Sequence, residues 1–179
     1  MRSVSIALVA LGVLLLTGSA GAQPPASSEP ELTAKRLALL REAVPGAAKI
    51  GLVGNPDALL VESQVREAIA AAVASGVAIN FIAVRDAAGV NGAVAAAVAA
   101  GTQALLVLAD EGDDAAVRAR LVEVAAARRL PALMVFREDA ERGALLAYWS
   151  ELVVNVKTAR ALGLSLPEAL VRRAALVIE

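Results

Sequence analysis

Residues 104–108 read ALLVL, an apolar run without a polar side chain in it. A strand of this composition is typical of the centre of a parallel sheet, because helices cover both faces of such a sheet. Helical patterns stand on either side of the run, at residues 89–100 and 114–127, where apolar residues recur every three or four positions. The run therefore predicts a buried central strand between two helices.

The same alternation of strand and helix extends outward in both directions. Glycine and proline stand in the short connections, as in Pro45-Gly46 and Gly54-Asn55-Pro56. The predicted strands are 49–53, 77–84, 104–108, 132–136, 144–148, 152–154 and 175–178, and the predicted helices are 33–44, 57–75, 89–100, 114–127, 138–142, 155–162 and 165–173. This order predicts an α/β fold with a single doubly wound, mostly parallel sheet flanked by helices.

Four helix starts carry a residue whose side chain can bond free backbone amides. The predicted caps are Asp57, Asp113 or Asp114, Asn155, and Ser165, the last within a capping box that Glu168 completes. In the helix that follows Asp57, an apolar residue recurs every fourth position. We expect this stripe to be the buried face, and it consists of Val61, Val65, Ile69 and Val73.

The N-terminus has the pattern of a signal peptide. Arg2 precedes a charge-free apolar stretch over residues 4–16, and Ala20-Gly21-Ala22 forms an A-x-A cleavage site. We expect residues 1–22 to be cleaved as a signal peptide, 23–30 (QPPASSEP) to be a linker, and 31–179 to form a periplasmic α/β lobe. The alternative is an uncleaved membrane anchor, although the stretch is shorter than the roughly 20 residues that span a bilayer.

The composition removes several classes of function. The chain has no histidine and no cysteine, which removes Ser-His, Cys-His and His-metal sites. Its formal net charge of −1 argues against a nucleic-acid partner, which selects for a basic face. No Gly-x-Gly-x-x-Gly or P-loop spacing is present. We therefore expect no cofactor, no metal and no enzymatic activity.

In a doubly wound sheet, ligands bind at the carboxyl ends of the strands. The side chains that follow the predicted strands are candidate ligand contacts: Asn55, Asp110, Phe136, Arg137 and Tyr148. Three of them have a second interpretation. Asn55 suits a turn, Asp110 a helix cap or a solvated acid, and Arg137 a surface pair with Glu138. Trp149 is interpreted as a cover for apolar surface.

Several stretches resemble a known family. They read TAKRLALLREAVPG (33–46), IGLVGNP (50–56), ALLVLAD (104–110), LPALMVFRE (130–138) and VVNVKTARALGL (153–164). Together they resemble the ABC-transporter substrate-binding proteins of the tryptophan/tyrosine type, which have the type I periplasmic-binding fold. The resemblance extends over nearly all of residues 31–179.

The resemblance implies a solute-binding component of an ABC importer, with a small solute such as an amino acid and the importer's membrane subunits as partners. Family members close two lobes on a ligand. Here the linker leads directly into what resembles the second lobe, and the family's long segment after Tyr148 is absent. We therefore expect a single C-terminal lobe with weak or lost solute binding.

Three alternatives stay open. The first is a periplasmic interaction or assembly module, in which an exposed face forms a homodimer that rebuilds a two-lobe cleft or docks on a partner. The second is a decayed, non-functional copy. The third is an enzyme on a flavodoxin-like scaffold, which the lack of any catalytic motif disfavours.

Overall fold

The structure, a computed structural model, describes residues 29–109 and 114–179. The predicted signal peptide and Asp110 lie outside these residues. The helices are α1 (Glu29–Ala43), α2 (Val61–Ser75), α3 (Val90–Ala99), α4 (Ala115–Ala127), α5 (Arg137–Arg142), α6 (Val156–Leu162) and α7 (Glu168–Arg172). The strands are β1 (Lys49–Gly54), β2 (Ala78–Ala83), β3 (Ala104–Val107), β4 (Ala132–Met134), β5 (Leu146–Tyr148), β6 (Leu152–Asn155) and β7 (Leu176–Ile178). Helix α1 begins inside the segment 23–30 that was predicted as a linker.

The described strands form one sheet in the order β2-β1-β3-β4-β5-β6-β7. Strands β1 to β5 are parallel, and β6 runs antiparallel to β5 after the short connection 149–151. The chain runs from β1 outward to β2 and then returns across the sheet to β3. Since this change of direction defines a doubly wound sheet, the predicted fold class is confirmed.

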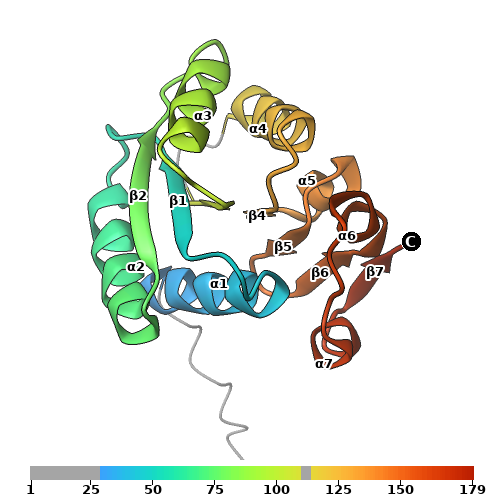
Figure 1. The fold of residues 1–179 in the computed structure, drawn as a ribbon. Coiled ribbons are helices and arrows are strands. Elements are labelled where there is room, and N and C mark those ends of the chain that lie inside the picture. Colours follow the sequence, from blue (N-terminus) through green and yellow to red (C-terminus); the bar gives the residue numbers. More distant parts are fainter. Residues whose placement is uncertain (1–28, 110–113) are drawn as a thin grey trace, which may run out of the picture.

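Helices cover both faces of the sheet, with α1 and α2 on one side and α3, α4 and α5 on the other (Figure 1). Successive side chains of the central strand β3 pack alternately against the helices on the two sides of the sheet. Leu106 packs with α1 and α2, whereas Leu105 and Val107 pack with α3 and α4. This explains why the run at 104–108 is apolar throughout, because both of its faces are buried.

The predicted start of α2 is wrong, and its predicted buried face is right only for Val61 and Val65, which are partly buried against the core. The helix begins after Leu60, which makes no side-chain cap, and Asp57 lies in the preceding turn. The buried side chains are Gln64, Ala68 and Ala72, whereas Ile69 and Val73 are 45% and 76% exposed. The small side chains of Ala68 and Ala72 lie at the centre of the buried face, which lets the helix approach its neighbours closely, and Ile69 and Val73 point away.

Of the predicted caps other than Asp57, two are confirmed and one is wrong. The Asp114 side chain accepts hydrogen bonds from the amides of Ala116 and Val117, and the Asn155 side chain accepts one from Thr158. The last helix, in contrast, begins after Pro167, and Ser165 does not cap it. A proline at this position needs no amide partner and fixes φ, so the chain enters the helix without a side-chain cap.

Candidate functional site

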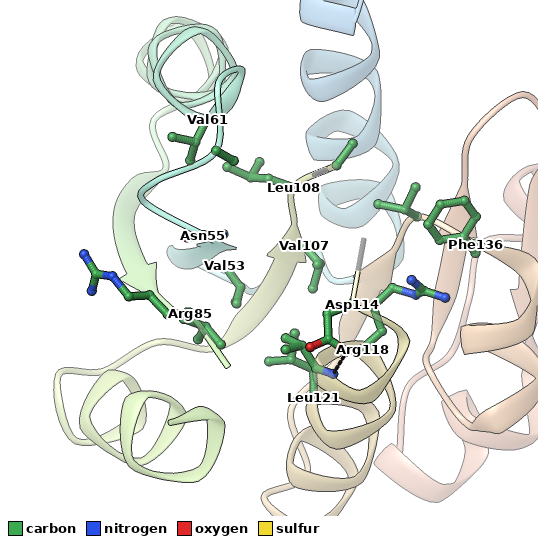
Figure 2. Close-up of a pocket in the computed structure, with 16 residues that line it drawn as sticks. Val53, Asn55, Val61, Arg85, Val107, Leu108, Asp114, Arg118, Leu121 and Phe136 are labelled. Carbon is green, nitrogen blue, oxygen red and sulfur yellow. Dashed lines mark hydrogen bonds between the residues drawn. The ribbon is translucent and has the colours of Figure 1, made fainter. Parts of the chain in front are cut away.

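A cleft lies at the carboxyl edge of the sheet, at the neighbouring strands β1 and β3 (Figure 2). The chain leaves these two strands in opposite directions, from β1 toward β2 and from β3 toward β4. The cleft has a volume of about 200 Å³. The residues that line it come from the ends of β1, β2, β3 and β4 and from the first turns of α2 and α4, and they include Asn55, Arg85, Leu108, Arg118 and Phe136. The cleft therefore occupies the place where doubly wound sheets bind ligands.

A buried glutamine fixes the end of β3 at this cleft. The Gln64 side chain donates to the Ala109 carbonyl at 2.8 Å and accepts from the Ala109 amide at 3.1 Å. Helix α2 thus holds the backbone that lines the cleft. The sequence interpretation missed this residue, and the only signal for it was a polar side chain one turn before Ala68 on the small-residue face of the helix.

Arg118 is the best-anchored cation in the cleft. Its guanidinium donates to the Asp139 carboxylate at 3.0 and 3.3 Å and lies 4.5 Å above the centre of the Phe136 ring. The side chain is only 14% exposed, and Asp139 is fully buried. Figure 2 shows it extending from α4 toward Phe136. An arginine held on two sides in this way is a preorganised site for an anionic group.

Two charge networks differ in burial. Burial raises the pKa of Asp139, and the nearby Arg118 and Arg142 guanidiniums oppose that rise. The other arginine of the cleft, Arg85, pairs with Asp57 at 2.8 Å, but both side chains are largely exposed. An exposed pair contributes little to stability, so the Arg85–Asp57 pair holds Arg85 less firmly than Asp139 holds Arg118.

Aromatic rings continue the cleft along the sheet edge. Phe136 and Trp149 stack with ring centres 6.4 Å apart and an interplanar angle of 14°. Arg36 lies 5.4 Å from the Trp149 ring centre, and its Nε donates to the Tyr148 carbonyl at 2.8 Å. Trp149 is 43% exposed. Two arginines therefore flank a pair of stacked rings at the ends of β4 and β5.

The structure brings together some of the predicted contacts and separates others. Asn55 and Phe136 line the cleft, and the Asn55 side chain also accepts from the Asp57 amide at 3.1 Å. Arg137 lies beside a neighbouring hollow with Trp149 and pairs with Glu141 at 2.6 Å, not with Glu138. Tyr148 is buried under Lys35, away from the cleft.

The described residues offer no group of acidic side chains that can hold a metal ion. In the same part of the chain, every helix is too short or too polar to cross a membrane. The cleft contains two arginines, one carboxylate, one side-chain amide and one aromatic ring, which are groups that bind and orient a solute: Arg85, Arg118, Asp114, Asn55 and Phe136.

Several solved structures share the fold. A conserved domain protein from Vibrio cholerae matches with a TM-score of 0.72 at 21% identity, covering 81% of this chain and 60% of that chain. The ABC domain from Streptococcus pneumoniae in complex with L-Trp gives 0.73 at 18% identity, covering 82% and 60%. A ligand-free, open substrate binding protein with adhesive properties from Clostridium difficile gives 0.63 at 18% identity, covering 80% and 59%.

The TM-scores show a common fold, and at identities this low they show the fold alone. The chain spans about 60% of the length of the structures it matches. The sequence profile of the ABC transporter substrate binding proteins matches residues 26–151. Since this is well over half of the chain, the protein belongs to that family, as the sequence resemblance indicated. The match ends before residues 153–164. No curated protein matches the chain in sequence.

Proposed function

We propose that this protein is a solute-binding component of an ABC importer and binds a small solute in the cleft between β1 and β3. The observation that carries the proposal is the position of the cleft at the carboxyl edge, where the topology leaves room for a ligand. Family membership supports the same function.

The proposed solute carries an anionic group and a flat apolar part, as an aromatic amino acid does. The Arg118 guanidinium faces the cleft with its orientation fixed by Asp139, and Phe136 offers a ring edge and a stacked partner in Trp149. A carboxylate is the natural partner for the arginine. The complex of a structural neighbour with L-Trp makes tryptophan a sensible first ligand to test.

We expect the affinity to be weak. A volume of about 200 Å³ lies below the roughly 300–1,000 Å³ of pockets that enclose a drug-sized ligand. A solute in this cleft stays partly hydrated, so we expect a dissociation constant on the order of 1 mM, or about 4 kcal/mol of binding free energy.

Trp149 provides the assay, because it is the only tryptophan and its ring stacks on a residue of the cleft. Its emission is recorded while the purified chain is titrated with amino acids; for tryptophan itself, nuclear magnetic resonance replaces fluorescence. We expect saturable binding that Arg118→Met and Asn55→Ala weaken at least about tenfold, or about 1.4 kcal/mol. Asn91→Ala, on the exposed surface of α3, is the matched control for Asn55→Ala.

The proposal fails if no solute in the panel gives saturable binding while circular dichroism shows a folded chain. It also fails if binding is retained in full by both Arg118→Met and Asn55→Ala, since the ligand then lies elsewhere.

Secretion to the periplasm belongs to the same proposal. We propose cleavage after Ala22, so that the mature chain begins at Gln23. Mass spectrometry of the protein recovered from a periplasmic extract tests this, and an intact N-terminus in the membrane fraction supports the anchor alternative instead.

A further inference from the structure

The outer edge of β2 presents unpaired backbone groups. Within residues 29–109 and 114–179, β2 pairs with β1 alone and ends the sheet (Figure 1). The Ala78 amide donates to Ala48 and the Val84 amide donates to Gly54, both residues lying toward β1. In a parallel ladder the intervening residues direct their amide and carbonyl groups the other way. Ile79, Phe81 and Ala83 therefore point these groups out of the sheet.

The surface beside this edge carries no charge. Residues 68–84, which span the second half of α2 and all of β2, contain no charged side chain. Exposed edge strands are normally protected by charged side chains, especially lysine, or by proline. Residues 68–84 contain neither. Instead Val73, Ile69 and Phe81 expose large apolar side chains there.

The exposed apolar residues lie on one face of the sheet. Ile82 and Val84 belong to the core beneath α3, and Ile79 packs against the core beneath α2. Because side chains alternate along a strand, Phe81 and Ala83 share the α2 side with Ile79. The open edge thus lies beside α2, and its exposed Phe81 is on the same side of the sheet as the exposed apolar residues of that helix.

We propose that this surface joins two copies of the chain into a dimer, with the two β2 strands paired antiparallel. A two-fold axis through the paired Phe81 residues places Ile79 opposite Ala83 of the second copy and forms one continuous sheet. The free amides and carbonyls of both edges are then satisfied, and the apolar sides of the two α2 helices meet. A second copy matches this edge in hydrogen-bonding pattern and brings no unpaired charge into the contact.

The dimer is independent of solute binding. Antiparallel pairing directs the carboxyl edges of the two sheets in opposite directions, so the two clefts lie at opposite ends of the dimer. The arrangement differs from a dimer that rebuilds a two-lobe cleft, because neither copy covers the cleft of the other.

Sedimentation velocity over about a hundredfold range of protein concentration tests the proposal, since self-association is governed by mass action. We expect a reversible monomer–dimer equilibrium. Val73→Lys places like charges against each other in the dimer and raises the dissociation constant at least about tenfold. Its matched control is Ala126→Lys, because both positions are exposed and lie in the last turn of a helix, where lysine is well tolerated.

A second readout addresses the strand directly. Amide hydrogen exchange at Ile79, Phe81 and Ala83 is expected to slow with rising protein concentration, whereas exchange at Ala78 and Val84 stays slow throughout. A chain that remains monomeric at the highest concentration overturns the proposal, as does a dimer that neither Val73→Lys nor Ala83→Lys weakens.

Discussion

The replacement of Gln64 by methionine tests whether α2 holds the floor of the cleft. The glutamine is 1% exposed and makes two hydrogen bonds to the backbone of Ala109. Methionine has a similar length and shape, so the change removes the hydrogen bonds and leaves the packing nearly intact. Each bond contributes roughly 0.5–1.5 kcal/mol, and the Ala109 groups lose this partner in a partly buried place. We expect the free energy of unfolding to fall by about 2 kcal/mol.

Gln103 supplies a control of the same chemistry in a different environment. Its side chain accepts from the amides of Ala48 and Lys49 at 2.8 and 3.2 Å, but the residue is exposed. Water replaces these bonds when Gln103→Met removes them, so we expect a loss below about 1 kcal/mol.

Urea unfolding followed by Trp149 fluorescence measures both variants. A stability change appears as a shift of the midpoint at constant slope. Equal losses for Gln64→Met and Gln103→Met refute the reasoning, because burial then makes no difference to the value of the two hydrogen bonds. A loss below about 0.5 kcal/mol for Gln64→Met refutes it as well.

Three further variants test other parts of the fold. Gly51→Ala is expected to cost about 1–3 kcal/mol by overpacking, since the new methyl group overlaps Ile82 Cδ1 and lies 3.0 Å from Thr102 Cγ2, and a midpoint unchanged in urea contradicts this. Asn155→Ala removes the cap of α6 and a bond to the Ala140 carbonyl at 2.8 Å, so we expect a loss of about 2–3 kcal/mol by calorimetry. Burial raises the pKa of Asp139 above 3.8, so its contribution to stability is largest below that pH and is lost as the pH rises through the raised pKa. The stability of the wild type relative to Asp139→Asn is therefore expected to increase as the medium is acidified, and a difference independent of pH contradicts this.

Much of the fold could be predicted because its signals are local. The apolar run at 104–108 and the periodic helices around it established the order of strands and helices, and Asp114 and Asn155 cap their helices as expected. The expectation that the side chains at the ends of the strands gather at one edge holds for Asn55 and Phe136, which line the same cleft.

The predictions that failed depended on neighbours distant in sequence. The spacing of Val61, Val65, Ile69 and Val73 is a helical stripe in either case, but which face of α2 is buried depends on α1 and β2. The same limit hid the roles of Gln64 and Arg118. Their partners, Ala109 and Asp139, lie far along the chain, and no local pattern links them.

The sequence by itself determined the fold class and the edge of the sheet where the cleft forms, because periodicity, turn residues and the parallel order of strands are local features of short segments. The family followed from the resemblance of several stretches to known members and from the profile match over residues 26–151. Only the tertiary structure decided which side chains reach that edge. It turned Tyr148 away under Lys35, aligned Arg118 between Phe136 and Asp139, and left the β2 edge open beside an uncharged face. The physical reason is that hydrophobic burial fixes which elements pack together, whereas the orientation of each helix is set by close contacts with its neighbours.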